Sequence, residues 1–252
     1  MTASPSSKDH DVEMSALKAV AQEYNRLDVP VVHIVGNHDV GIDRAISERL
    51  LGCTLNCHSR DLKGWHLSFF NASAKVVDLS VSLEDCDLSW LADDLSRTEL
   101  PTIVFSHVPF GGTAMVGNFY FERLAPRLGE YANSARARAI VRQHKNVLLA
   151  ISAHAHWNRF HTLEGVHYIT IQSVTESFTT FPDPAEAWAL LRLRPQLLQL
   201  DIYGRDGLRI ELPVKIPRQE WLYAPERLEG ESFSRYEQRV RALYPRDSDP
   251  TG

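Results

Sequence analysis

Three apolar runs that each lead into a histidine-containing turn place the strongest constraint on how this chain folds. The runs and the turns that follow them are residues 29–35 with 36–39, residues 102–105 with 106–109, and residues 147–151 with 152–156. Their β-branched and aliphatic composition is typical of strands buried on both faces of a parallel sheet. Because ligands of open α/β sheets bind at the carboxyl ends of strands, we expect the polar side chains of the three turns to meet at one sheet edge.

These turns contain side chains that suit a metal ion, namely Asn37, His107, His154 and His156. Imidazole nitrogens and a carboxamide oxygen are ligands for Zn, Mn or Fe(II), and a bound divalent ion lowers the pKa of coordinated water. His38 is expected to point away from Asn37 and to act as a general acid for a leaving oxygen, with Asp39 as its orienting partner. A single histidine at a strand end is as well explained by a structural role, but the combination in this order predicts a metal site.

Composition narrows the classes of partner. The 252 residues are 44% hydrophobic and 23% charged, which is ordinary for a globular protein that buries a sizeable core. The formal net charge of −5 gives no general attraction to nucleic acid or to anionic membranes, so neither partner is expected. No run of eighteen apolar residues predicts a membrane span.

The three cysteines, Cys53, Cys57 and Cys86, are too few for a disulfide framework and lack the second pair that a structural zinc site requires. Reduced thiols suit an intracellular compartment, and the amino terminus lacks the apolar core of a signal peptide. We therefore expect a cytoplasmic location.

Periodicity predicts an amphipathic helix over residues 14–27, preceded by residues 9–11 as cap and loop. The other elements alternate between helices and strands up to His156, and strands follow one another after it. Helices are predicted at 42–51, 83–100, 134–143 and 232–243, and further strands at 65–70, 75–79, 159–162, 166–171, 187–193, 197–203 and 208–212. This pattern divides the chain into a domain at 1–212 and a partly helical extension at 213–252, whose last residues, 247–252, we expect to be disordered.

The sequences Gly36-Asn37-His38-Asp39, Ser106-His107-Val108-Pro109 and Ala153-His154-Ala155-His156 resemble the last three of five motifs of the calcineurin-like metallophosphoesterases. Their order, spacing and strand-to-turn context agree, and the resemblance covers roughly residues 10–212. It implies an α/β fold, a two-layered β-sandwich flanked by helices. It also implies a centre of two divalent metal ions (Mn, Fe or Zn) at the strand ends.

By position, the resemblance implies that Asn37, His107 and His154 bind the second metal and that His156 binds the first. His38 would protonate the leaving group while a metal-bridging hydroxide attacks phosphorus. The expected reaction is hydrolysis of a small phosphomonoester, phosphodiester or nucleotide. The oligomeric state is not indicated.

The family's first two motifs, an Asp-x-His and a Gly-Asp, are not found before the first helix. Two explanations stay open. Either the sequence begins after amino-terminal strands that carry them, which we expect, or the chain is a product with half of the site. Ala153 also replaces the usual glycine of the last motif.

Three functional hypotheses follow. The first is a metallophosphoesterase whose activity is impaired in this truncated form. The alternative is a catalytically inactive relative that serves as a binding or regulatory scaffold, and a third is a mononuclear metal-binding protein that uses Asn37, His107 and His154.

Overall fold

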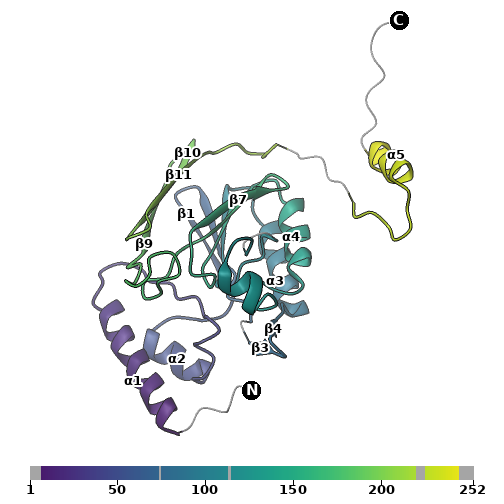
Figure 1. Cartoon of the computed structure of the whole chain (residues 1–252). Helices are drawn as coiled ribbons and strands as arrows, with labels where there is room; N and C mark the ends of the chain where they lie inside the picture. Colours follow the sequence, from purple (N-terminus) through teal and green to yellow (C-terminus); the bar gives the residue numbers. More distant parts are fainter. Residues whose placement is uncertain (1–6, 74, 113–114, 220–224, 244–252) are drawn as a thin grey trace, which may run out of the picture.

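A computed structural model describes residues 7–73, 75–112, 115–219 and 225–243 (Figure 1). Its centre is a six-stranded sheet with the order β1-β2-β5-β6-β8-β7. The strands are β1 (His58–Leu62), β2 (Trp65–Phe69), β5 (Thr102–Phe105), β6 (Val147–Ser152), β8 (Val166–Thr170) and β7 (Arg159–Leu163). The four inner strands are mutually parallel, and the edge strands β1 and β7 are antiparallel to their neighbours.

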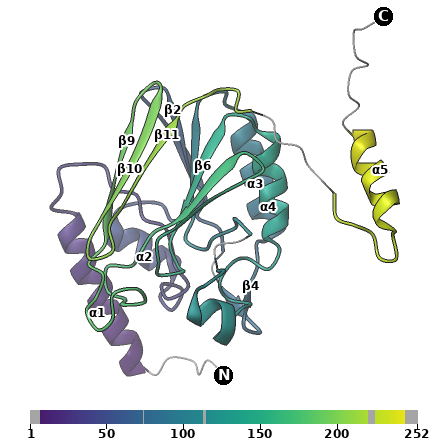
Figure 2. The same cartoon turned by 45° about the horizontal axis from the view of Figure 1, so that its top comes forward.

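Two different layers cover the faces of this sheet (Figure 2). Helices α3 (Asp85–Ser96) and α4 (Ser134–Gln143) cover one face, and a three-stranded sheet of β9 (Trp188–Leu193), β10 (Leu197–Tyr203) and β11 (Leu208–Pro213) covers the other. Consecutive residues of β5 point to opposite faces of the sheet. Ile103 packs in one core cluster with Leu198 and Leu200 of β10, and Val104 packs in the other with Leu91 of α3. The predicted α/β fold, a sheet sandwich flanked by helices, is confirmed.

Most predicted elements are confirmed, including α2 (Arg44–Leu51), α3, α4 and the strands from β5 onward. The helix predicted at 14–27 is α1 (Ser7–Tyr24), so the expectation that residues 9–11 cap it is wrong because they lie inside it. The strand predicted at 75–79 is a small hairpin of β3 (Val76–Val77) and β4 (Ser80–Val81), whose two turn residues both have positive φ. β1 was not predicted, and the expected disorder at 247–252 falls outside the described residues.

The apolar run at residues 29–35 is not a strand, which corrects the most prominent expectation from the sequence. Val29 is 62% exposed, and the segment lines a cavity of about 690 Å³ together with α1 and α2. A strand forms only where its backbone is hydrogen-bonded to a neighbouring strand, and no described strand lies beside residues 29–35. Instead, the Asn71 side chain accepts from the Val35 backbone N–H (2.8 Å) and donates to the His33 carbonyl (3.1 Å), which holds the segment extended.

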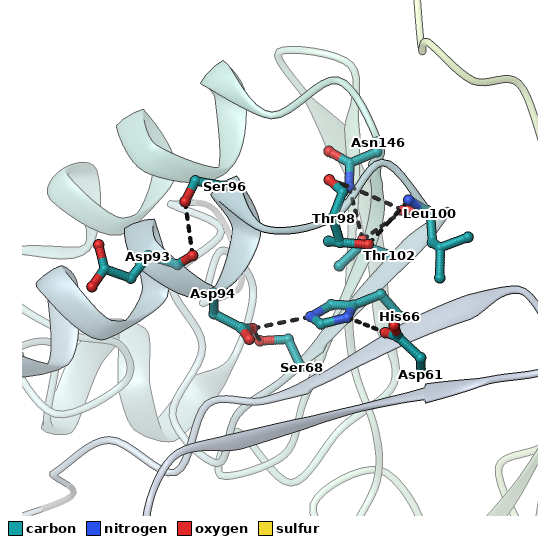
Figure 3. Close-up of polar contacts among 10 residues, drawn as sticks. All are labelled: Asp61, His66, Ser68, Asp93, Asp94, Ser96, Thr98, Leu100, Thr102 and Asn146. Atoms are coloured by element: carbon teal, nitrogen blue, oxygen red, sulfur yellow. Dashed lines mark hydrogen bonds and ion pairs between the residues drawn. The ribbon is translucent and has the colours of Figure 1, made fainter.

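A buried polar network joins β2 to α3 (Figure 3). Asp94 of α3 accepts a hydrogen bond from the Ser68 hydroxyl (2.6 Å) and lies 3.2 Å from His66 Nε2. The other ring nitrogen of His66 lies 2.6 Å from Asp61 in β1. Asp94, Ser68 and His66 are all at least 93% buried, so water does not replace these partners. The network therefore fixes the helix against two strands.

The three cysteines are free, as the sequence predicts, and they should differ in reactivity. Burial, with Asp87 adding to it, raises the pKa of the Cys57 thiol to about 12, so very little of this thiol is ionised at pH 8. Cys86 is exposed at the start of α3. Brief alkylation with iodoacetamide at pH 8, read by peptide mass spectrometry, is expected to modify Cys86 and to spare Cys57. Equal labelling of the two in the folded protein would contradict the packing around Cys57.

The chain beyond β11 stays attached to the domain through Arg218. This side chain is 7% exposed and donates to the carbonyl oxygens of Val147 (3.1 Å), Arg142 (2.8 Å) and Glu164 (3.0 Å). Helix α5 (Phe233–Leu243) follows and is drawn apart from the sheets in Figure 1. The division at residue 212 remains a prediction. Over the described ranges, no helix combines the length and apolar character needed to cross a bilayer.

Candidate metal centre

The turns that follow residues 29–35, β5 and β6 bring three of the predicted ligands together. Asn37 Oδ1 lies 3.0 Å from His107 Nε2 and 3.0 Å from His154 Nδ1. The two imidazole nitrogens are 3.3 Å apart. Asn37, His107 and His154 are separated by 70 and 47 positions in sequence, so only the fold brings them together. We call these three residues the triad.

Hydrogen bonding and burial set the protonation of the two histidines. His154 Nε2 lies 2.7 Å from the Leu128 carbonyl, and a carbonyl only accepts, so this nitrogen carries the proton and Nδ1 presents a lone pair to the triad. Burial lowers the pKa of His107 to about 3 and that of His154 to about 4, and neighbouring histidines contribute to both shifts. Both rings are therefore neutral at pH 7, as metal ligation requires.

The spacing of the triad fits a divalent ion. Two ligand atoms that each lie about 2.1 Å from one metal ion are about 3.0 Å apart in octahedral and about 3.4 Å apart in tetrahedral coordination. The three distances between the ligand atoms of the triad, 3.0, 3.0 and 3.3 Å, fall in this range. The tautomer set by the Leu128 carbonyl leaves the His154 Nδ1 lone pair facing Asn37 Oδ1, and two such lone pairs can bind one cation.

The local backbone conformation sets the direction of the His154 and His156 side chains. His154 and His156 have φ of 60° and 53°, in the left-handed region that residues with a β-carbon rarely adopt. Gly36 lies against the triad, where a β-carbon would be 2.9 Å from His107 Cε1, so a larger residue would displace that ring. Ala153, the departure from the family pattern, needs no such freedom because its φ is not positive.

His156 does not join the triad. Its Nδ1 is buried without a hydrogen-bond partner among the described residues, and its ring lies 5.3 Å from that of Phe178. Burial lowers the pKa of His156 and the nearby Glu176 raises it. The unpartnered Nδ1 is therefore available to a ligand that the described residues do not supply.

His38 and Asp39 lie beside the triad on an exposed turn and line the 690 Å³ cavity. The charged form of His38 would lower the pKa of His107, His154 and His156, which places His38 close to all three. The Asp39 carboxylate accepts from the Gly36 backbone N–H (2.7 Å), so it stabilises the turn. No hydrogen bond between Asp39 and His38 is present in the described structure, and the orienting role expected of Asp39 stays a prediction.

Sequence reasoning missed Asn118, which holds the turn that contains His154 and His156. Asn118 is 2% exposed, and its side-chain amide donates to the Ala155 carbonyl (3.0 Å), between His154 and His156. Its Oδ1 accepts from the N–H groups of Tyr120 and Phe121 and so caps the π-helix η1 (Phe119–Leu124). The sequence signal was an asparagine directly before an apolar run, which is typical of a helix start.

Carboxylates are not part of the triad. Within the described ranges, no three side chains of histidine, cysteine, aspartate or glutamate form a group able to hold a metal ion. The triad is not such a group because its third member, Asn37, has an amide side chain. It therefore offers three neutral ligands, and a bound ion would keep its full positive charge there.

Comparison with known proteins concerns the fold. No family model matches the sequence, and no curated protein matches it. Among solved structures, the chain is similar to a dimetal phosphatase from Danio rerio, with a TM-score of 0.64 and 18% identity over 82% of this chain and 80% of that one. A phosphopantetheinyl hydrolase from Mycobacterium tuberculosis aligns with a TM-score of 0.35 and 12% identity over 62% and 68% of the two chains. The likeness to the dimetal phosphatase shows that the chain has a metallophosphoesterase-like fold.

Proposed function

We propose that this chain is a metal-dependent phosphoesterase that hydrolyses phosphomonoesters or phosphodiesters and holds a divalent ion, Mn, Fe or Zn, at the triad. The observation that carries the proposal is the convergence of Asn37, His107 and His154 at ligand spacing, from three separate turns. The fold shared with a dimetal phosphatase supports the same class of reaction.

The residues have distinct parts in this proposal. A divalent ion at the triad supplies positive charge to a phosphate group and lowers the pKa of water. His154 is held in one tautomer by the Leu128 carbonyl, and Gly36 leaves room for the His107 ring. His156, with its free buried nitrogen, is the proposed ligand of a second ion. His38 is exposed on the turn, and we assign to it the protonation of the leaving oxygen.

A second candidate is a metal-binding scaffold without catalysis. It is favoured by the absence of any aspartate or glutamate from the triad in the described structure, because carboxylates commonly complete two-metal hydrolytic sites. This candidate predicts that the triad binds a metal ion and that no phosphate ester is turned over.

Turnover of chromogenic substrates separates the two candidates. The full chain with added Mn²⁺ is expected to hydrolyse bis-p-nitrophenyl phosphate or p-nitrophenyl phosphate, and EDTA is expected to abolish the activity. Mn²⁺ binding without turnover of either ester would favour the scaffold.

The general-acid role of His38 gives a sharper prediction. His38→Ala is expected to lower kcat about 100-fold for esters with poor, alkyl leaving groups and much less for p-nitrophenyl esters, because a good leaving group needs no proton. His10→Ala, a change of the same kind at an exposed position in α1, serves as the control. A loss that is uniform across leaving groups would argue against proton donation by His38.

A further inference from the structure

An exposed group of aromatic rings lies next to the candidate metal centre. The rings of Phe119 and Phe178 are 5.0 Å apart at 54°, and those of Tyr120 and Phe178 are 6.0 Å apart at 52°. Phe119 is 55% exposed and Tyr120 37% exposed, although large aromatic side chains are usually buried. We call Phe119, Tyr120 and Phe178 the aromatic surface.

The aromatic surface is tied to the candidate centre by direct contacts. Phe178 packs on His156, with ring centroids 5.3 Å apart, and Phe121, the next residue of η1, packs on His154 at 5.1 Å. Asn118 joins η1 to the Ala155 carbonyl in the same turn. These contacts place the rings directly beside the histidines. π-Helices such as η1 are rare and are frequently found at functional sites.

The chemistry of this surface suits a planar ring. Aromatic side chains stack on nucleobases of any sequence because every base has a π-face. Phe178 contacts His156 and also contacts Phe119 and Tyr120. It therefore connects the histidines, where we propose that the phosphate binds, to the exposed rings. A ligand with its phosphate at the histidines would place its next group against these rings.

We propose that Phe119, Tyr120 and Phe178 bind the base of a nucleotide, so that the phosphate ester presented to the candidate metal centre is a nucleoside phosphate. This inference rests on the proposed function for the phosphate side of the site. The stacking part does not, because a base without phosphate binds the same rings.

Adenosine, which has no phosphate, tests the aromatic surface without metal or turnover. Saturation-transfer NMR on the full chain in EDTA is expected to show transfer to the adenine protons, and Phe119→Ala is expected to weaken adenosine binding about tenfold. Tyr120→Ala should weaken it in the same direction, and Phe119→Tyr should restore it. Phe233→Ala is the matched control, since Phe233 is also exposed (67%) but lies outside the cluster; it should leave binding unchanged.

If adenosine binds, three results with competitors and variants would overturn the inference. One is unchanged adenosine binding in Phe119→Ala and Tyr120→Ala. A second is displacement of adenosine by hexyl phosphate as readily as by AMP, which would mark a general apolar surface. A third is loss of adenosine binding in Val20→Trp, which places a larger side chain in the 690 Å³ cavity, with no loss in the aromatic variants.

The two proposals fail in different ways. Adenosine binding that depends on Phe119, in a protein that hydrolyses no ester, would support the aromatic surface and reject the phosphoesterase. Hydrolysis of simple esters with no adenosine binding would reject the aromatic surface alone.

Discussion

His154→Ala is expected to lower the affinity of the chain for Mn²⁺ by about 100-fold or more. The change removes the Nδ1 ligand that lies 3.0 Å from Asn37 Oδ1 and 3.3 Å from His107 Nε2, and two neutral ligands remain. Calorimetric titration of the metal-free protein measures the affinity directly. Asn37→Asp is the complementary variant. It keeps an oxygen at the same position and adds a negative charge, so we expect it to bind Mn²⁺ at least as tightly as the native chain.

His161→Ala provides the control for this comparison. His161, like His154, places Nε2 next to a backbone carbonyl, that of Gly111 at 3.1 Å, and has a buried Nδ1. It stacks on Tyr168 and is not part of the triad. Its replacement should leave Mn²⁺ affinity unchanged. Equal losses in His154→Ala and His161→Ala would mean that the effect comes from general loosening of the fold.

Asp94→Ala is expected to lower the free energy of unfolding by about 3 to 5 kcal/mol, the largest effect on stability that we predict. The change leaves the buried Ser68 hydroxyl and the buried Nε2 of His66 without their acceptor (Figure 3). For a chain of this length, such a loss lowers Tm by roughly 10 °C. Urea denaturation followed by circular dichroism measures it.

Asp93→Ala is the matched control because Asp93 is the preceding residue of the same helix. Its side chain is 72% exposed and has a weak ion pair with Arg97 at 3.8 Å. Its replacement is expected to change stability by no more than about 0.5 kcal/mol. An Asp94→Ala protein as stable as Asp93→Ala would show that the network is not important for holding α3 to β2.

Sequence patterns predicted the helices and strands of the domain well where each strand has a neighbouring strand to pair with. β5 and β6 are buried parallel strands, and α4 has the predicted bounds. The run at 29–35 has an equally strong β composition but is not a strand. β-Propensity describes how side chains fit a pleated, half-buried surface, and it forms no ladder by itself. Where no described strand adjoins, a single side chain, Asn71, holds the backbone extended.

The candidate site was predictable in part for a similar reason. Histidines at the ends of β5 and β6 indicated where His107 and His154 would meet, because parallel strands end at one sheet edge. Asn37 joins them although the residues before it form no strand. The roles of Asn118 and Phe178 depend on loop conformations that follow from long-range packing. Asn118 contacts a carbonyl 37 positions away, and nothing in a local pattern specifies that contact.

Diffraction from crystals soaked in Mn²⁺, with data collected at the manganese absorption edge, tests the central claim most directly. We predict an anomalous peak about 2.1 to 2.3 Å from Asn37 Oδ1, His107 Nε2 and His154 Nδ1. A structure in which Mn²⁺ is absent from this position, or occupies a different place with the triad unliganded, would contradict the assignment of these residues as metal ligands.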